Sequence, residues 1–196
     1  MRGRMHVGAL CLVVGLLAGC GSSPKVTFYT LSAGPSREGA AAADAKTAYR
    51  VAVGPVALPE VVDRPQLVVR VGENRVVIAE QHRWAEPLKS EIPRVLAENL
   101  AQLLGTRQVS VYPQSTSGDA EYRVLVDFQR VESVLGEAVT IDALWTVRRT
   151  SGGEPRRGRS FVRESINGDG YEAVVAAHSR AFATVSRDLA EAIRAF

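Results

Sequence analysis

Apolar and polar residues alternate along several short segments of this chain, which is the pattern of strands that bury one face. The clearest cases are residues 122–131 and 138–147, which are separated by Gly136. The first carries Val124, Val126 and Phe128 on one face, and the second carries Val139, Ile141, Ala143, Trp145 and Val147 on one face. They predict a long antiparallel hairpin with one face toward a core. Shorter β-branched or apolar runs predict further strands at residues 26–31, 49–56, 67–71, 75–79, 109–112 and 160–166.

Two other segments repeat apolar residues every three or four positions, which is typical of amphipathic helices. The first begins at Pro87 and ends before Gly105, residue types that favour these two ends, although Pro93 should kink the helix or delay its start. The second covers residues 171–196. The order of elements predicts an α/β fold: one mixed, mostly antiparallel sheet with two long helices packed on it.

The N-terminus has a different pattern. Arg2 and Arg4 precede an uninterrupted run of eleven apolar residues, 7–17, as in a secretory signal peptide. The run would span about 16 Å as a helix against a hydrocarbon core of ~30 Å, so its length argues against a transmembrane anchor.

The run ends in Leu17-Ala18-Gly19-Cys20, which resembles the lipobox of bacterial lipoproteins. The resemblance implies a diacylglyceryl group on Cys20 and removal of the signal peptide, residues 1–19. The alternative is that Cys20 lies near an ordinary cleavage site by chance. In Gram-negative lipoproteins, an Asp directly after the lipidated cysteine resembles the signal for retention in the inner membrane. Gly21 occupies that place here, so the resemblance implies transport to the outer membrane, with the protein facing the periplasm.

The mature chain is therefore expected to begin with a lipidated tether, residues 20–25, and to continue as a single domain, residues 26–196. Residues 32–48 are rich in Ala, Gly and Ser and predict a flexible loop. Loss of Arg2 and Arg4 lowers the formal net charge from +3 to +1, so the overall charge indicates no acidic partner. Nucleic acid is not expected outside the cytoplasm.

The residues offer little for catalysis. With Cys11 in the signal and Cys20 lipidated, the domain keeps no thiol for a disulfide, a metal site or a nucleophile. His178 falls on the apolar stripe of the last helix without a second ligand at metal spacing, which favours a packed histidine over a metal ligand. Neither a Gly-x-Ser-x-Gly elbow nor a phosphate-binding loop occurs. We expect no catalytic residues, no metal and no cofactor.

Residues 53–70, Trp84-Ala85-Glu86-Pro87-Leu88, and residues 100–104 with the following Val-Ser-Val-Tyr-Pro resemble the PqiC-like ABC-transport auxiliary lipoproteins. The lipobox and residues 28–31 fit the same pattern. The resemblance implies a three-layer α/β domain similar to the anticodon-binding-like fold of the TolB N-terminal part. It also implies a non-catalytic subunit of an MCE-type intermembrane lipid-transport system. Its partners would be a periplasmic MCE-domain protein, an inner-membrane transport component and, through the acyl chains, the inner leaflet of the outer membrane. A homo-oligomeric ring would suit the end of a lipid channel.

Two groups of residues are candidate contact sites. Arg64, Pro65 and Gln66 either dock the channel protein or direct the chain into the following hairpin, with Arg64 paired to a carboxylate. Trp84 either anchors a partner or belongs to the core. The predicted turn at residues 148–159 either contacts lipid phosphates or is a solvated hairpin tip; its five arginines are Arg148, Arg149, Arg156, Arg157 and Arg159.

Two other functions compete with anchoring and docking. A lipid carrier would need a hollow apolar core that holds an acyl chain. A periplasmic hydrolase would need a nucleophile and a base in an accessible site, which the sequence does not indicate.

Overall fold

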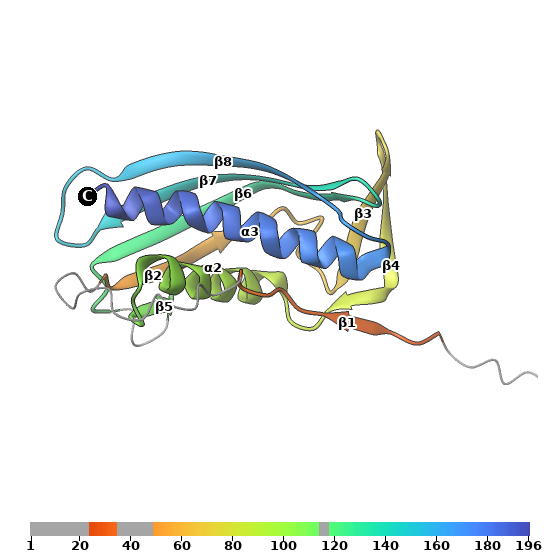
Figure 1. The fold of residues 1–196 in the computed structure, drawn as a ribbon, viewed down its shortest axis with the longest axis horizontal. Helices are drawn as coiled ribbons and strands as arrows, with labels where there is room; N and C mark the ends of the chain where they lie inside the picture. Colours follow the sequence, from red (N-terminus) through yellow and green to blue (C-terminus); the bar gives the residue numbers. More distant parts are fainter. Residues whose placement is uncertain (1–23, 35–48, 114–117) are drawn as a thin grey trace, which may run out of the picture.

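The computed structural model describes residues 24–34, 49–113 and 118–196 (Figure 1). The expected signal peptide, Cys20 and most of the loop at residues 32–48 lie outside the described residues. No helix in the described ranges is both long and apolar enough to cross a membrane.

Eight strands of the described residues form one curved sheet, built around the long hairpin that the alternation predicts. The hairpin strands β6 and β7 pair along their length, and β8 continues the antiparallel order on the far side of β7. On its other side β6 runs parallel to β2 and meets β3, which forms a hairpin with β4. The edge strands β1 and β5 pair in parallel with β4 and β2. The bounds are β1 Thr27–Tyr29, β2 Val51–Ala57, β3 Gln66–Gly72, β4 Arg75–Trp84, β5 Val109–Val111, β6 Tyr122–Val134, β7 Ala138–Arg149 and β8 Arg156–Ser165.

Two long helices, α2 (Leu88–Leu104) and α3 (Gly170–Arg194), pack on the sheet and against each other. Helix α3 lies along β7 and β8, whereas α2 lies along β2 and β5 (Figure 1). The α/β class and the mixed sheet carrying two helices are therefore confirmed. Helix α2 starts directly at Leu88 and runs through Pro93, so the expected delay does not occur. It ends where Gly105 takes a left-handed conformation with φ of 65°, which glycine adopts without a Cβ penalty.

The core lies between the helices and the face of the sheet that they cover. Val124 and Val126 of β6 and Ile141 of β7 are almost fully buried, as their alternation predicts. Phe128 of β6 meets Phe182 of α3 edge to face, with ring centroids 5.6 Å apart. Such an aromatic pair adds about 0.5–1.5 kcal/mol beyond the area that it buries.

The predicted turn at residues 148–159 is shorter in the structure. Strand β7 continues to Arg149 and β8 already begins at Arg156, four residues before the predicted strand. Backbone hydrogen bonds between the two strands extend to the pair Val147 and Arg156. Charged residues hide such an extension from the hydrophobic pattern, because their side chains face solvent while their backbone completes the ladder.

Candidate membrane-anchor and docking surfaces

The first described residues form a strap, residues 24–34, that runs from the sheet edge into the space between α2 and α3. Within it, β1 pairs with the end of β4, and the carbonyl of Tyr29 accepts the N–H of Ala85 at 2.7 Å. The Tyr29 hydroxyl lies 2.8 Å from Nδ1 of His82, whose ring stacks on Tyr171 of α3 with centroids 3.9 Å apart. The strap is therefore joined to both the sheet and a helix.

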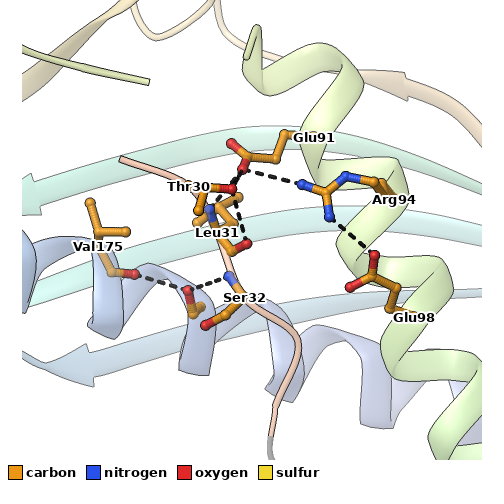
Figure 2. Close-up of polar contacts among 8 residues, drawn as sticks. Thr30, Leu31, Ser32, Glu91, Arg94, Glu98 and Val175 are labelled. Atoms are coloured by element: carbon orange, nitrogen blue, oxygen red, sulfur yellow. Dashed lines mark hydrogen bonds and ion pairs between the residues drawn. The ribbon is translucent and has the colours of Figure 1, made fainter. Parts of the chain in front are cut away.

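Glu91 of α2 binds the strap with a fully buried carboxylate. Its Oε1 accepts the backbone N–H of Leu31 at 2.8 Å and the hydroxyl of Thr30, as Figure 2 shows. Nη2 of Arg94, one turn further along, lies 3.4 Å from the same oxygen. Removing a carboxylate from water costs several kcal/mol. The guanidinium and these two donors offset part of that cost at Oε1, whereas Oε2 has no hydrogen-bond partner among the described residues.

Two more helix side chains accept hydrogen bonds from backbone N–H groups of the strap. Ser179 of α3 accepts the N–H of Ser32 at 3.1 Å and donates to the carbonyl of Val175, also at 3.1 Å (Figure 2). Asn99 of α2 accepts the N–H of Gly34 at 2.8 Å. Side chains from two helices thus satisfy backbone donors that a neighbouring strand would otherwise pair.

A strand is expected at residues 26–31 from the sequence, and β1 covers Thr27–Tyr29 of it, but the hydrophobic pattern does not reveal the helix side chains that bind this segment. A signal was present, because Glu91 and Asn99 are eight residues apart, a little over two helical turns, and border the apolar stripe of α2. Polar residues at the margin of a buried stripe need partners, since an unpaired buried polar group is costly.

The docking candidates Arg64, Pro65 and Gln66 lie where the chain enters β3. Pro65 is exposed, while its carbonyl accepts the N–H of Trp84 at 2.7 Å. Gln66 donates to Glu80 at 3.1 Å. The segment thus directs the chain into the hairpin and also presents a surface, which agrees with both interpretations. Arg64 forms no ion pair with the described residues, and its Nε has no hydrogen-bond partner among them, so the expected carboxylate partner stays a prediction.

The structure places Trp84 in the core instead of on a docking surface. Its side chain is 6% exposed and meets the ring of His178 edge-on, with centroids 5.7 Å apart. Since a partner cannot reach a side chain covered on this scale, the partner-anchor interpretation of Trp84 is wrong and the core interpretation holds.

A serine and a histidine also meet in this core. Ser133 Oγ of β6 and His178 Nε2 of α3 lie 2.8 Å apart, but both residues are buried. No substrate reaches this pair, and the other ring nitrogen of His178 has no hydrogen-bond partner among the described residues to orient the base. The arrangement does not supply the accessible nucleophile that a hydrolase requires.

Burial makes His178 a source of acid sensitivity. It lowers the pKa of His178 from 6.5 to about 4, because the charged ring would lose its hydration. The unfolded chain therefore binds the proton first, so the free energy of unfolding should fall by up to about 1.4 kcal/mol per pH unit as pH drops through this window. Urea denaturation at pH 7 and pH 5 measures the loss. In the His178→Gln variant the loss should be smaller, and an equal loss in both proteins would contradict this assignment.

The five candidate arginines lie on strands rather than in one loop, and three of them have partners. Arg149 pairs with Glu121 at 2.8 Å, and Arg159 forms two hydrogen bonds with Asp142, at 2.7 and 2.6 Å. These bonds from Arg159 hold the pKa of Asp142 below its usual range. Arg156 donates to the carbonyl of Ala195 and lies over the ring of Phe196.

Arg148 and Arg157 remain exposed, and neither forms an ion pair with the described residues. Arg148 lies opposite Arg123 of β6 in the register, and Arg123 is an additional cation that is distant from the other arginines in the sequence. The guanidinium of Arg123 lies 4.4 Å above the ring of Tyr112. The part of the cluster available to a phosphate is therefore smaller than the five residues in the sequence indicate.

A groove of about 720 Å³ between α2 and α3 bears on the lipid-carrier alternative. Its lining includes Leu103 and Ala183 but also four charged side chains of α3, among them Arg180 and Arg187. An acyl chain is best held by a pocket with a predominantly apolar wall. This groove does not favour an acyl chain as its ligand.

The class of protein follows from the sequence over most of its length. Residues 29–190 match the family model described as the ABC-type transport auxiliary lipoprotein component. The chain belongs to this family, as the sequence motifs indicated. No curated protein matches the sequence.

Solved structures agree on the fold. The chain is similar to an uncharacterized protein with a TM-score of 0.69 and 21% identity, over 87% of this chain and 99% of the other. It is also similar to a protein from Xanthomonas campestris, with a TM-score of 0.63 and 16% identity, over 83% and 92% of the two chains. A PelC dodecamer from Paraburkholderia phytofirmans has a TM-score of 0.41 at 13% identity, over 74% and 88%, which is too distant to bear on assembly here.

Proposed function

We propose that this chain is a non-catalytic outer-membrane lipoprotein subunit of an MCE-type intermembrane lipid-transport system. Membership of the auxiliary family supports a role in transport, and the lipobox supports lipid attachment at Cys20. The observation that carries the proposal is the strap. Residues 24–34 begin four positions after Cys20 and are hydrogen-bonded to both helices, so a lipid anchor would hold the folded domain close to the membrane.

The proposed mechanism is mechanical. Acyl chains on Cys20 would insert into the inner leaflet of the outer membrane, where each buried methylene contributes roughly 0.8 kcal/mol and two lipid signals suffice for stable anchoring. The domain would then keep the end of a periplasmic lipid channel at that leaflet. Arg64, Pro65 and Gln66 are the proposed docking segment for the MCE-domain protein, which an inner-membrane component would serve. A homo-oligomeric ring would place several such segments around the channel axis.

The Cys20→Ala variant tests both anchoring and docking. Without the thiol there is no site for the diacylglyceryl group, so we expect the protein to leave the outer-membrane fraction of its native host. The periplasmic MCE-domain protein should then no longer co-purify with that fraction. Membrane fractionation followed by mass spectrometry of co-purified proteins measures both effects.

The matched control is Cys11→Ala, which changes the other cysteine of the chain within the apolar run of the signal. It should leave fractionation and partner recovery unchanged. Outer-membrane fractionation of the Cys20→Ala variant at the level of the unmodified protein would refute the anchor. Loss of the protein without loss of the MCE-domain protein would refute docking.

A further inference from the structure

Phe28 is an exposed aromatic residue on the edge strand nearest to the tether. Its side chain is 63% exposed, whereas the next residue, Tyr29, packs against the core and Leu31 is buried. Successive side chains of a strand point to opposite faces, so the inward placement of Tyr29 turns Phe28 outward. In the register of β1 and β4, Phe28 lies beside Arg83.

The position of Phe28 in the chain limits its distance from the lipid. It follows Cys20 by eight residues, and a fully extended chain of that length spans at most about 29 Å. Pro24, where the described chain begins, is within about 14 Å of Cys20 by the same measure. The edge formed by β1 is thus the part of the domain that the tether brings to the bilayer first.

The charges around Phe28 are mixed, with Lys25 as an exposed cation and Glu172 close to the neighbouring Tyr29. Lys25 lies three residues before Phe28, and Arg83 is partly exposed. Glu80 faces Arg83 at 3.8 Å and reduces its effect, which leaves Lys25 as the main cation at this edge. Cations near a membrane surface are attracted to lipid phosphates, and aromatic residues occupy the boundary between headgroups and acyl chains.

We propose that Phe28 inserts into the headgroup boundary of the leaflet that holds the lipid anchor, with Lys25 at the phosphates. This inference rests on the proposed lipid attachment and adds an orientation to it: the β1 edge faces the membrane. The hydrogen bonds of Leu31, Ser32 and Gly34 join the strap to the two helices, so the orientation of β1 also fixes that of the helices.

The orientation places the arginine cluster away from the bilayer. Figure 1 shows β1 toward one end of the long axis and the turn between β7 and β8 near the C-terminus at the other end. In this orientation Arg148 and Arg157 do not contact the leaflet that receives Phe28. They remain available to solvent or to a protein partner.

Phe161 supplies a matched control, because it is the same residue type, is 62% exposed and lies on β8, away from β1. Full-length lipidated Phe28→Trp and Phe161→Trp variants are reconstituted into vesicles of phosphatidylethanolamine and phosphatidylglycerol with brominated phosphatidylcholine. Bromine quenches tryptophan only at short range, and emission of the unsubstituted protein is subtracted for the two native tryptophans. The added emission of Phe28→Trp should shift to the blue and lose most of its intensity, while that of Phe161→Trp should change little.

Flotation of the vesicles distinguishes failure of the proposed lipid attachment from failure of the proposed orientation. Protein that does not float with lipid lacks the anchor, which overturns the proposed attachment and the orientation together. Protein that floats while the two variants are quenched alike, or while Phe161→Trp is quenched more, keeps the anchor and overturns the orientation.

Discussion

Replacing Glu91 with alanine should destabilise the domain by about 3 kcal/mol, because breaking a buried polar cluster leaves its remaining members without partners. The N–H of Leu31 and the hydroxyl of Thr30 would lose their acceptor, and Arg94 would lose one of its two carboxylates. We also expect the strap to open locally. Urea denaturation measures the first effect, and amide hydrogen exchange at Leu31, Ser32 and Gly34 measures the second.

Glu98 gives the matched control for this prediction. It lies two turns further along the same helix and pairs with Arg94 at 3.0 Å, but its side chain is 46% exposed. An exposed pair is worth about 0–1 kcal/mol, so Glu98→Ala should change stability little and leave exchange at Leu31 slow. If Glu91→Ala behaved like Glu98→Ala, the strap would not depend on the buried carboxylate.

Replacing Trp84 with alanine should lower the free energy of unfolding by about 3–5 kcal/mol, because the substitution removes a large core side chain and leaves a cavity. Trp84 ends β4 beside the strap and contacts His178 of α3, so the cavity would lie where sheet, strap and helix meet. Thermal or urea denaturation of the domain measures the effect.

Phe161→Ala is the corresponding control, since that ring is mostly exposed and its removal should cost within about 0.5 kcal/mol. A small effect of Trp84→Ala combined with loss of partner recovery would revive the anchor interpretation that the burial of Trp84 contradicts. A large loss of stability in both variants would instead indicate that the outer face of β8 is covered in solution.

Periodic segments were predictable from the sequence because one-sided burial imposes a regular spacing. The alternation before and after Gly136 predicted the β6–β7 hairpin, and the stripe that ends at Gly105 predicted α2. The strand ends that flank the turn between β7 and β8 were not predictable in this way, because their charged side chains face solvent. Arg148 and Arg156 therefore looked like parts of a loop, although their backbone belongs to β7 and β8.

The candidate sites also differ in how far the sequence alone could predict them. Sequence motifs indicated the family, and they predict the lipid attachment at Cys20, because a processing signal and a family pattern are properties of the sequence itself. The role of a polar side chain depended on what folding brings next to it. Glu91 and Arg94 resemble an ordinary surface pair on a helix, yet the first carboxylate is buried against residues sixty positions earlier.

By itself, the sequence determined the class of fold, the helix and strand periods and the family, and it predicts a lipid signal that ends at Cys20. Only the tertiary structure decided that Trp84 is core, that three of five arginines are engaged, and that two helices clamp the strap. The physical reason is that a local pattern gives the spacing of buried positions along the chain. Which side chains meet in the folded domain depends on contacts between segments that are distant in the sequence.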